Sequence, residues 1–234
     1  MPNPLVRDDL VELLLDVHGL DELLRLPAFA DHERETAQLF LGSARRIARE
    51  ALFPSYRPLD LAPPTFDGTK VRTNDALPAL YRQLVELGCI AATRPTSAGG
   101  EALPQLVFGL ATAYLMAGNL AVYGYAGLTA GAAHPIERFG TPELDRVYRK
   151  PMLEGRFTGT MALTEPQAGS SLADVTARAT PAAEGSFRIR GSKIFISGGD
   201  HTLAENVVHL LLARIDGAPA GTRGISLFVV PQKS

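Results

Sequence analysis

The stretch MALTEPQAGSS, residues 161–171, divides a helix-like half of the chain from a strand-like half. Before it, apolar residues recur at helical spacing, whereas around and after it they alternate as in strands. Within it, Thr164 closes an alternating segment, and Pro166 cannot extend that strand because proline donates no hydrogen bond to a β-ladder. The sequence therefore predicts an α+β fold, with a helical domain over residues 1–155 and a β domain over residues 156–234.

The helical half contains several recognisable starts and stops. Apolar residues line one face of residues 32–51, which predicts a helix there with Asp31 as its N-cap. Residues 53–73 hold four prolines and are expected to form a loop. Asp75 can start a further helix, and Thr141 followed by a proline is a typical start of another.

The β half contains short segments of strand-like pattern separated by turns. One of them, VVHLLLA, is continuously apolar, as in a strand that is covered on both faces. The expected strands span residues 156–163, 173–179, 187–190, 192–197, 206–213 and 225–230.

The bulk composition excludes several classes of protein. The chain is 46% hydrophobic and 21% charged, with 23 basic and 25 acidic residues and a net charge of −2. This balance is typical of a soluble globular protein and gives no electrostatic basis for binding nucleic acid or an anionic membrane. The single cysteine, Cys89, allows no internal disulfide, and the N-terminus lacks the pattern of a signal peptide. We therefore expect a cytoplasmic protein.

One segment has the length of a membrane span. Residues 102–136 contain no Asp, Glu, Lys or Arg. However, Pro104, Asn119 and Pro135 interrupt the segment, and its many glycines suit close helix packing. We expect buried helices of a soluble protein and no membrane association.

Several common functional motifs are missing. The sequence has no G-x-G-x-x-G after a strand, no P-loop and no G-x-S-x-G nucleophile motif. Its five histidines form no pair at metal-binding spacing, so we expect no metal. His209, within the apolar run, is interpreted as a hydrogen-bonded core histidine.

The turn after Thr164 could bind an anion. Gly169 allows close backbone approach, and Ser170 and Ser171 offer hydroxyl and N–H groups. A polar loop whose serines only cap neighbouring turns explains the same residues, and spacing alone favours that interpretation.

A second stretch, KIFISGGD at residues 193–200, combines an aromatic ring and a hydroxyl. In a strand, Phe195 and Ser197 would lie on the same face, where they could hold a planar heteroaromatic ring. A core phenylalanine and a turn-capping serine are the alternative interpretation.

Together the two stretches resemble the middle domain of the acyl-CoA dehydrogenases, whose signature has the form T-E-P-x-A-G-S-D. The likeness extends to F-G-T-P-E-L and P-M-L-E-G-R-F-T-G-T upstream and covers most of the chain. The leucine-rich N-terminus and GGDHTLAENVVHLLLAR resemble the branch that includes methylmercaptopropionyl-CoA dehydrogenase. Ser171 departs from the family's aspartate, and Phe195 replaces a frequent tryptophan.

The resemblance implies that the chain binds FAD. Thr164 would hydrogen-bond near the reactive edge of the flavin, Ser197 would lie near N5, and Ser170 would contact both the FAD phosphates and the acyl-CoA substrate. The implied cofactor-binding residues are Met161, Leu163, Thr164, Gly169, Ser170, Phe195, Ile196 and Ser197.

The resemblance also implies a reaction and partners. In the family a carboxylate removes the α-proton of an acyl-CoA while a β-hydride passes to flavin N5. Electrons then leave to an electron-transfer flavoprotein or another acceptor, and the proteins are homo-oligomers. The carboxylate belongs to a C-terminal helical domain, which we expect to be absent here, with the middle domain incomplete. Glu165 is interpreted as a solvated or capping turn residue, so no catalytic base can be named and the chain alone is expected to be inactive.

Two other functions remain open on these residues. A flavin oxidase or monooxygenase of the same fold would share the flavin motifs. A non-catalytic or degenerate relative would share the fold without the reaction, although the near-neutral charge disfavours one that binds nucleic acid.

Overall fold

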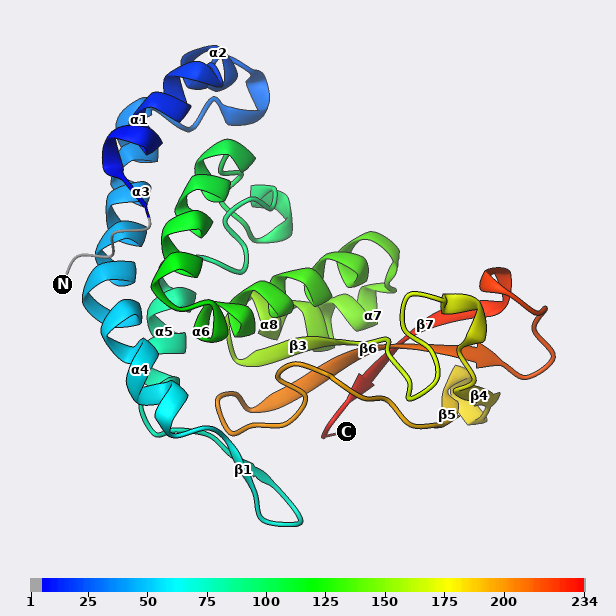
Figure 1. Cartoon of the computed structure of the whole chain (residues 1–234). Coiled ribbons are helices and arrows are strands. Elements are labelled where there is room, and N and C mark those ends of the chain that lie inside the picture. Colours follow the sequence, from blue (N-terminus) through cyan, green and yellow to red (C-terminus); the bar gives the residue numbers. More distant parts are fainter. Residues whose placement is uncertain (1–5, 234) are drawn as a thin grey trace.

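The computed structural model describes residues 6–233 and consists of a helical part followed by a β-sheet (Figure 1). Residues 1–5, which enter the signal-peptide prediction, and Ser234 lie outside the described residues. The expected α+β architecture is confirmed. The helices are α1 (Asp8–Val17), α2 (Leu20–Leu24), α3 (Arg34–Ile47), α4 (Phe53–Leu61), α5 (Leu77–Glu86), α6 (Gln105–Phe139), α7 (Pro142–Leu144) and α8 (Lys150–Leu153).

Helix α3 begins later than its sequence suggests. Glu33, and not Asp31, is the N-cap, and the Glu33 N–H donates to the Thr36 side-chain oxygen at 3.0 Å. This pairing satisfies a backbone donor that the first turn of a helix leaves free. The predicted helix over residues 32–51 is confirmed in its main part.

Helix α4 replaces the first part of the predicted loop over residues 53–73. A π-helical turn, Ala48–Leu52, carries the chain from α3 directly into α4. Pro54 directly follows this π-helical turn inside one continuous helical run, and because proline has no N–H to donate to the preceding turn, the regular α-helical hydrogen-bond pattern is interrupted there. The remainder forms a small hairpin of β1 (Thr65–Phe66) and β2 (Val71–Arg72).

Polar side chains form hydrogen bonds at two other helix starts. Thr141 accepts a hydrogen bond from the Leu144 N–H at 3.2 Å, which confirms the predicted start of α7. For α5 the N-cap is Ala76 and not Asp75, and the Asn74 side-chain oxygen accepts from the Ala76 N–H at 2.9 Å just before the helix begins.

The long helix α6 is bent at Asn119. The backbone there has φ −162° and ψ 98°, outside the helical region. The Asn119 side-chain oxygen accepts from the Val122 N–H at 3.3 Å, and its amide donates to the Ser55 hydroxyl at 3.1 Å. Asn119 therefore caps the second half of α6 and ties the bend to α4.

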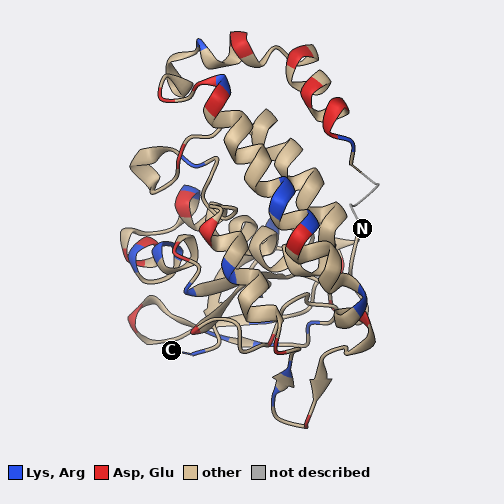
Figure 2. Ribbon diagram, turned by 90° about the vertical axis from the view of Figure 1, so that its left-hand side faces the viewer, with Lys and Arg blue, Asp and Glu red and all other residues tan. Residues whose placement is uncertain are grey.

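By length and composition alone α6 could cross a membrane. In the fold, one face of its first half belongs to the main hydrophobic core, with Val107, Ala111 and Leu115 fully buried. Its second half lies over strand β3 (Figure 1). Basic and acidic residues both occur along the ribbon, with acidic residues prominent on the N-terminal helices (Figure 2).

The sheet is built around one long central strand. β3 and β4 both lie parallel to β6 along one of its edges, one after the other, whereas β7 pairs antiparallel with the opposite edge. β5 continues the sheet antiparallel to β4. The strands are β3 (Phe157–Ala162), β4 (Arg178–Pro181), β5 (Phe187–Arg190), β6 (Asn206–Ile215) and β7 (Ile225–Pro231).

Two predicted strands are wrong. Within residues 173–179 a 3-10 turn precedes β4, which begins only at Arg178. Residues 192–197 form no strand, because the chain leaves β5 and runs back toward the end of β3. Gly191 makes this path possible: a Cβ there would lie 2.8 Å from the Ala177 Cβ.

Helix α6 and strand β3 approach closely at Gly159. A Cβ at Gly159 would lie 2.4 Å from the Cβ of Ala132, so only glycine fits at this crossing. The Gly159 N–H donates to the Thr129 hydroxyl of α6 at 3.0 Å. This contact fixes the helix over the strand that leads into the MALTEPQAGSS stretch.

Candidate functional site

The two stretches singled out in the sequence lie side by side. The Ile194 N–H donates to the Thr164 carbonyl at 2.9 Å, and the Lys193 ammonium donates to the Leu163 carbonyl, also at 2.9 Å. Residues about thirty positions apart are thereby joined where β3 ends, so the predicted ring-facing and turn-forming residues lie on neighbouring segments.

The buried side chain of Glu165 stabilises this junction. Its side chain is 2% exposed and accepts a hydrogen bond from the Lys193 ammonium at 2.8 Å. The Thr176 N–H and hydroxyl and the Ala177 N–H also donate to it, at 2.8 to 3.0 Å. Burial opposes ionisation, but these hydrogen bonds outweigh it and lower the pKa of Glu165 to about 2. Glu165 is thus a buried structural carboxylate, and its interpretation as solvated is wrong.

The sequence interpretation missed the role of Lys193, although a signal was present. Glu165 and Lys193 are the only charged residues in the stretches 161–171 and 193–199, and they have opposite signs. Two opposite charges in otherwise uncharged segments indicate a buried pair that joins them.

The turn after Glu165 presents free backbone donors. The N–H groups of Gly169, Ser170 and Ser171 donate to no other group in the described part of the chain, and Ser170 is exposed. A cluster of free N–H groups at a turn suits a phosphate. The predicted phosphate-binding residues therefore fit that group.

Exposed apolar side chains lie near this turn in the sequence. Met161 is 41% exposed, although Ala162 beside it is buried in the sheet, and Leu163 and Thr164 are half-buried. A surface strand end of this kind offers an apolar face with a neighbouring hydroxyl, which fits a flat aromatic ring with polar edges.

Phe195 is the least protected large apolar residue of the site. Its side chain is 87% exposed, and its backbone has φ +58°, which is uncommon for residues other than glycine. Because residues 192–197 are not a strand, the expectation that Phe195 and Ser197 share a strand face is wrong. Ile196 is half-buried and Ser197 is exposed next to Gly198. An exposed aromatic ring in a strained backbone conformation fits a binding position better than a core position.

A pocket of about 390 Å³ adjoins Ser197. Its opposite wall is one face of α6 just after the bend. The lining residues are Leu120, Ala121, Gly124, Tyr125, Leu128, Ser197 and Gly198. The lining is mainly apolar, with the serine at one side, so it suits the hydrocarbon part of a ligand whose reacting end lies near Ser197.

His201 packs against Tyr125, one of the residues that line this pocket. It is 5% exposed, and its Nδ1 accepts from the Leu203 N–H at 3.1 Å, so its Nε2 carries the proton and donates to the Thr158 hydroxyl at 3.0 Å. Burial lowers the pKa of His201 to about 4, which keeps the ring neutral. Its ring meets the Tyr125 ring edge-on at 5.3 Å.

His209 also behaves as a core histidine. Its Nδ1 lies 2.7 Å from the Thr160 hydroxyl, and burial lowers its pKa, as the hydrogen-bonded core interpretation predicts. Within residues 6–233, no group of three or more His, Cys, Asp and Glu side chains is arranged to hold a metal ion.

Models of two domains cover most of the chain. The N-terminal domain of acyl-CoA dehydrogenases matches residues 34–156, and the middle domain matches residues 160–234. The chain belongs to the acyl-CoA dehydrogenase family.

Individual relatives agree with this membership. The 3-methylmercaptopropionyl-CoA dehydrogenase of Ruegeria pomeroyi is 35% identical over 88% of this chain and 35% of that protein. The butyryl-CoA dehydrogenase of Megasphaera elsdenii superposes with a TM-score of 0.68 at 26% identity, covering 86% of this chain and 50% of that one. A chain from the structure of the electron transferring flavoprotein of Acidaminococcus fermentans superposes with a TM-score of 0.69 at 26% identity, covering 86% and 49%. The chain spans about a third of the length of the curated relatives it matches.

Proposed function

We propose that this chain forms the helical and β parts of an FAD-dependent acyl-CoA dehydrogenase, which carries out the α,β-dehydrogenation of an acyl-CoA thioester. The observation that carries the proposal is the junction of the two stretches. Lys193 and Ile194 join them into one surface, which offers free N–H groups at one end and the exposed Phe195 at the other. These are the groups that a cofactor with both phosphates and a flat ring requires.

Each part of the surface has its own role in this proposal. The N–H groups of Gly169 and Ser170 bind the FAD phosphates, and Phe195 packs against the ring, where bound FAD supplies the hydride acceptor. Ser197 and Thr164 orient the reacting edge by hydrogen bonds. The pocket between Ser197 and α6 receives the acyl chain, and its apolar wall excludes water from the reacting carbons.

Glu165 does not serve as the base that removes the α-proton. Five donor groups, including the Gln167 side-chain amide, already engage its oxygens, and its pKa of about 2 makes it a weak base at neutral pH. We propose that the base is supplied from outside this chain, which makes the chain inactive on its own.

The proposal extends to partners and location. The substrate is an acyl-CoA, and electrons leave to an electron-transfer flavoprotein or a comparable acceptor. The complete protein is a homo-oligomer in the cytoplasm. The functions of the relatives support the acyl-CoA substrate and the electron acceptor.

The test combines flavin loading with an acyl-CoA titration. The purified chain is mixed with FAD, separated from free flavin and examined by visible absorption, and butanoyl-CoA is then added without oxygen. We expect bound flavin whose absorbance does not bleach. Bleaching would refute the inactivity of this chain, and failure to retain any flavin would refute the FAD site.

A matched pair of variants ties the result to the proposed surface. Phe195→Ala removes the exposed ring and should weaken FAD binding about tenfold or more, given the energy of an aromatic stacking contact. Phe187→Ala removes a partly exposed phenylalanine of β5, which packs on Phe228, and should leave FAD binding unchanged. Equal loss of FAD binding in both variants would contradict the assignment.

A further inference from the structure

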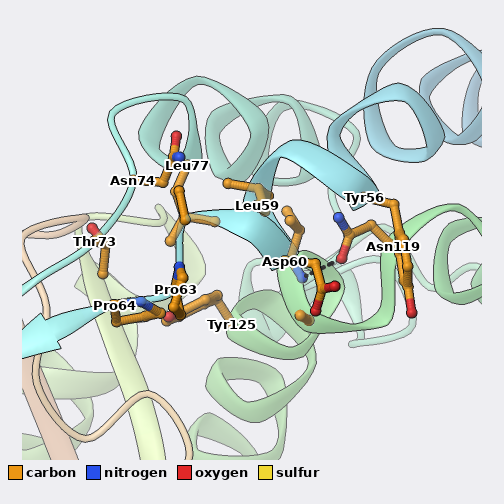
Figure 3. Close-up of a pocket in the computed structure, with 13 residues that line it drawn as sticks. Tyr56, Leu59, Asp60, Pro63, Pro64, Thr73, Asn74, Leu77, Asn119 and Tyr125 are labelled. Carbon is orange, nitrogen blue, oxygen red and sulfur yellow. Dashed lines mark hydrogen bonds between the residues drawn. The ribbon is translucent and has the colours of Figure 1, made fainter.

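A second pocket shares Tyr125 with the proposed acyl pocket, and Figure 3 shows its lining residues, with Tyr125 at its edge. Its volume is about 310 Å³, and it lies between α4, the segment that follows α4, and α6. Both pockets are lined by Ala121 and Tyr125 of α6, so they are neighbours along one helix face. Tyr125 is the large side chain that the two pockets share.

The Tyr125 ring is held in place from the β side. It meets the His201 ring edge-on, with the ring planes at 81°. Gly198 approaches it so closely that a Cβ there would lie 3.3 Å from a ring carbon. His201 in turn is fixed by its hydrogen bonds to Thr158 and Leu203. The ring therefore forms a fixed partition and not a freely rotating side chain.

The walls of the second pocket indicate what it can accept. Its apolar lining includes Leu59, Pro63, Pro64, Leu77 and Val122. Polar groups also line it: Tyr56 and Asp60 of α4, Thr73 and Asn74 of the loop before α5, and Asn119 at the bend of α6. An apolar pocket of this kind suits an alkyl chain and not a phosphate or a nucleotide.

We propose that Tyr125 sets the acyl-chain length that this site accepts. A short acyl chain lies in the pocket beside Ser197 and ends against the Tyr125 ring, whereas the second pocket takes the alkyl end of a longer chain only when that ring is removed. The substrate class is therefore short-chain acyl-CoA. This inference rests on the proposed function, because it requires that the acyl chain enters beside Ser197.

The test measures binding as a function of chain length. Calorimetry gives the Kd of butanoyl-, octanoyl-, dodecanoyl- and hexadecanoyl-CoA for the chain in the presence of FAD. For the unchanged chain, affinity should stop rising beyond the short acyl-CoAs. For Tyr125→Ala, it should continue to rise with length, by up to roughly fourfold for each methylene that becomes buried.

Three further variants distinguish a length limit set by the Tyr125 ring from a general effect of the substitution on acyl-CoA binding. Tyr125→Phe keeps the ring and should retain the length limit. Tyr125→Leu opens a smaller passage and should extend the limit partly, which keeps the test valid if the alanine variant folds poorly. Ala62→Trp combined with Tyr125→Ala places a large side chain in the second pocket and should restore the limit.

The outcomes distinguish this inference from the proposed function. An unchanged length profile in both Tyr125→Ala and Tyr125→Leu, with butanoyl-CoA still bound, would overturn the inference and leave the proposed function standing. Failure of the unchanged chain to bind any acyl-CoA would overturn both. A shifted profile that Ala62→Trp does not reverse would also overturn the assignment of the second pocket.

Discussion

At the residue scale, one buried ion pair organises the candidate site. Lys193 and Glu165 are 8% and 2% exposed, and they join the ends of two stretches that the sequence separates widely. A buried pair of this kind contributes little if both charges are replaced, but removing one partner leaves an uncompensated charge in the interior. The pair therefore sets the position of Thr164 and Phe195 more than it sets the stability of the chain.

The first prediction concerns Lys193→Met. It leaves the Glu165 carboxylate buried without its cation, and we expect the free energy of unfolding to fall by about 3 kcal/mol, as measured by urea denaturation. Adding Glu165→Gln removes the stranded charge and should recover part of the loss.

The control is Arg156→Met, which breaks an exposed pair with Glu205. Its effect should be below about 1 kcal/mol, because water screens that pair. Equal losses in Lys193→Met and Arg156→Met would show that the buried pair has no special role.

At the element scale, the crossing of α6 over β3 positions everything that follows. The second half of α6 begins at the cap formed by Asn119 and passes over Gly159, and its other face lines the proposed acyl pocket. The bend and the close crossing thus act together: the cap at Asn119 sets the direction of the second half of α6, and Gly159 leaves room for the helix to pass close to β3.

The second prediction concerns Gly159→Ala. The new methyl group would meet the Ala132 Cβ at 2.4 Å, so either α6 or β3 must move, and we expect a loss of about 1 to 3 kcal/mol in urea denaturation. Gly109→Ala is the matched control on α6, since a Cβ there meets nothing within 4 Å. The control should be neutral or stabilising by up to about 1 kcal/mol, because alanine favours a helix. Equal destabilisation by both variants would contradict the close crossing.

At the scale of the whole molecule, stability depends on pH through a buried neutral ring. The unfolded chain binds a proton at His201 below about pH 6.5, whereas the folded chain binds it only near pH 4, because burial disfavours the charged ring and the effect of Asp200 is smaller. The free energy of unfolding is therefore unaffected by the titration of His201 above about pH 6.5, and it falls as the pH is lowered from 6.5 toward 4. Glu165, with its pKa of about 2, responds only below its ordinary value of 4.5 and so acts in a lower range.

The third prediction follows from that difference. The free energy of unfolding should be about 2 kcal/mol lower at pH 5 than at pH 7, in urea denaturation at constant ionic strength. His201→Gln should reduce most of this dependence, and the remainder should reflect His209. The exposed His134 provides the control, and His134→Gln should keep the full dependence. A pH response that is unchanged in His201→Gln would contradict the buried neutral histidine.

Helix capping shows how far local sequence predicts structure here. Thr141 was identifiable as an N-cap because the cap acts within one turn, through a hydrogen bond to Leu144. The predictions that Asp31 and Asp75 are N-caps were wrong because a neighbouring residue can occupy that position equally well. The choice depends on the direction in which the preceding segment enters the helix. The predicted loop over residues 53–73 failed for the same reason, since the π-helical turn before Pro54 is maintained by packing against α6 at Gly118.

The sequence by itself determined the class of fold, the approximate strands and the two stretches that carry the candidate site, because periodicity and motif residues act locally. Only the tertiary structure decided that residues 192–197 are not a strand and that Glu165 is buried against Lys193. It also decided that Tyr125 lies between two pockets. The physical reason is that these features depend on contacts between distant segments. The buried Glu165 carboxylate is stabilised only because Lys193 packs against it. The Tyr125 ring separates two pockets only because His201 and Gly198 pack against it.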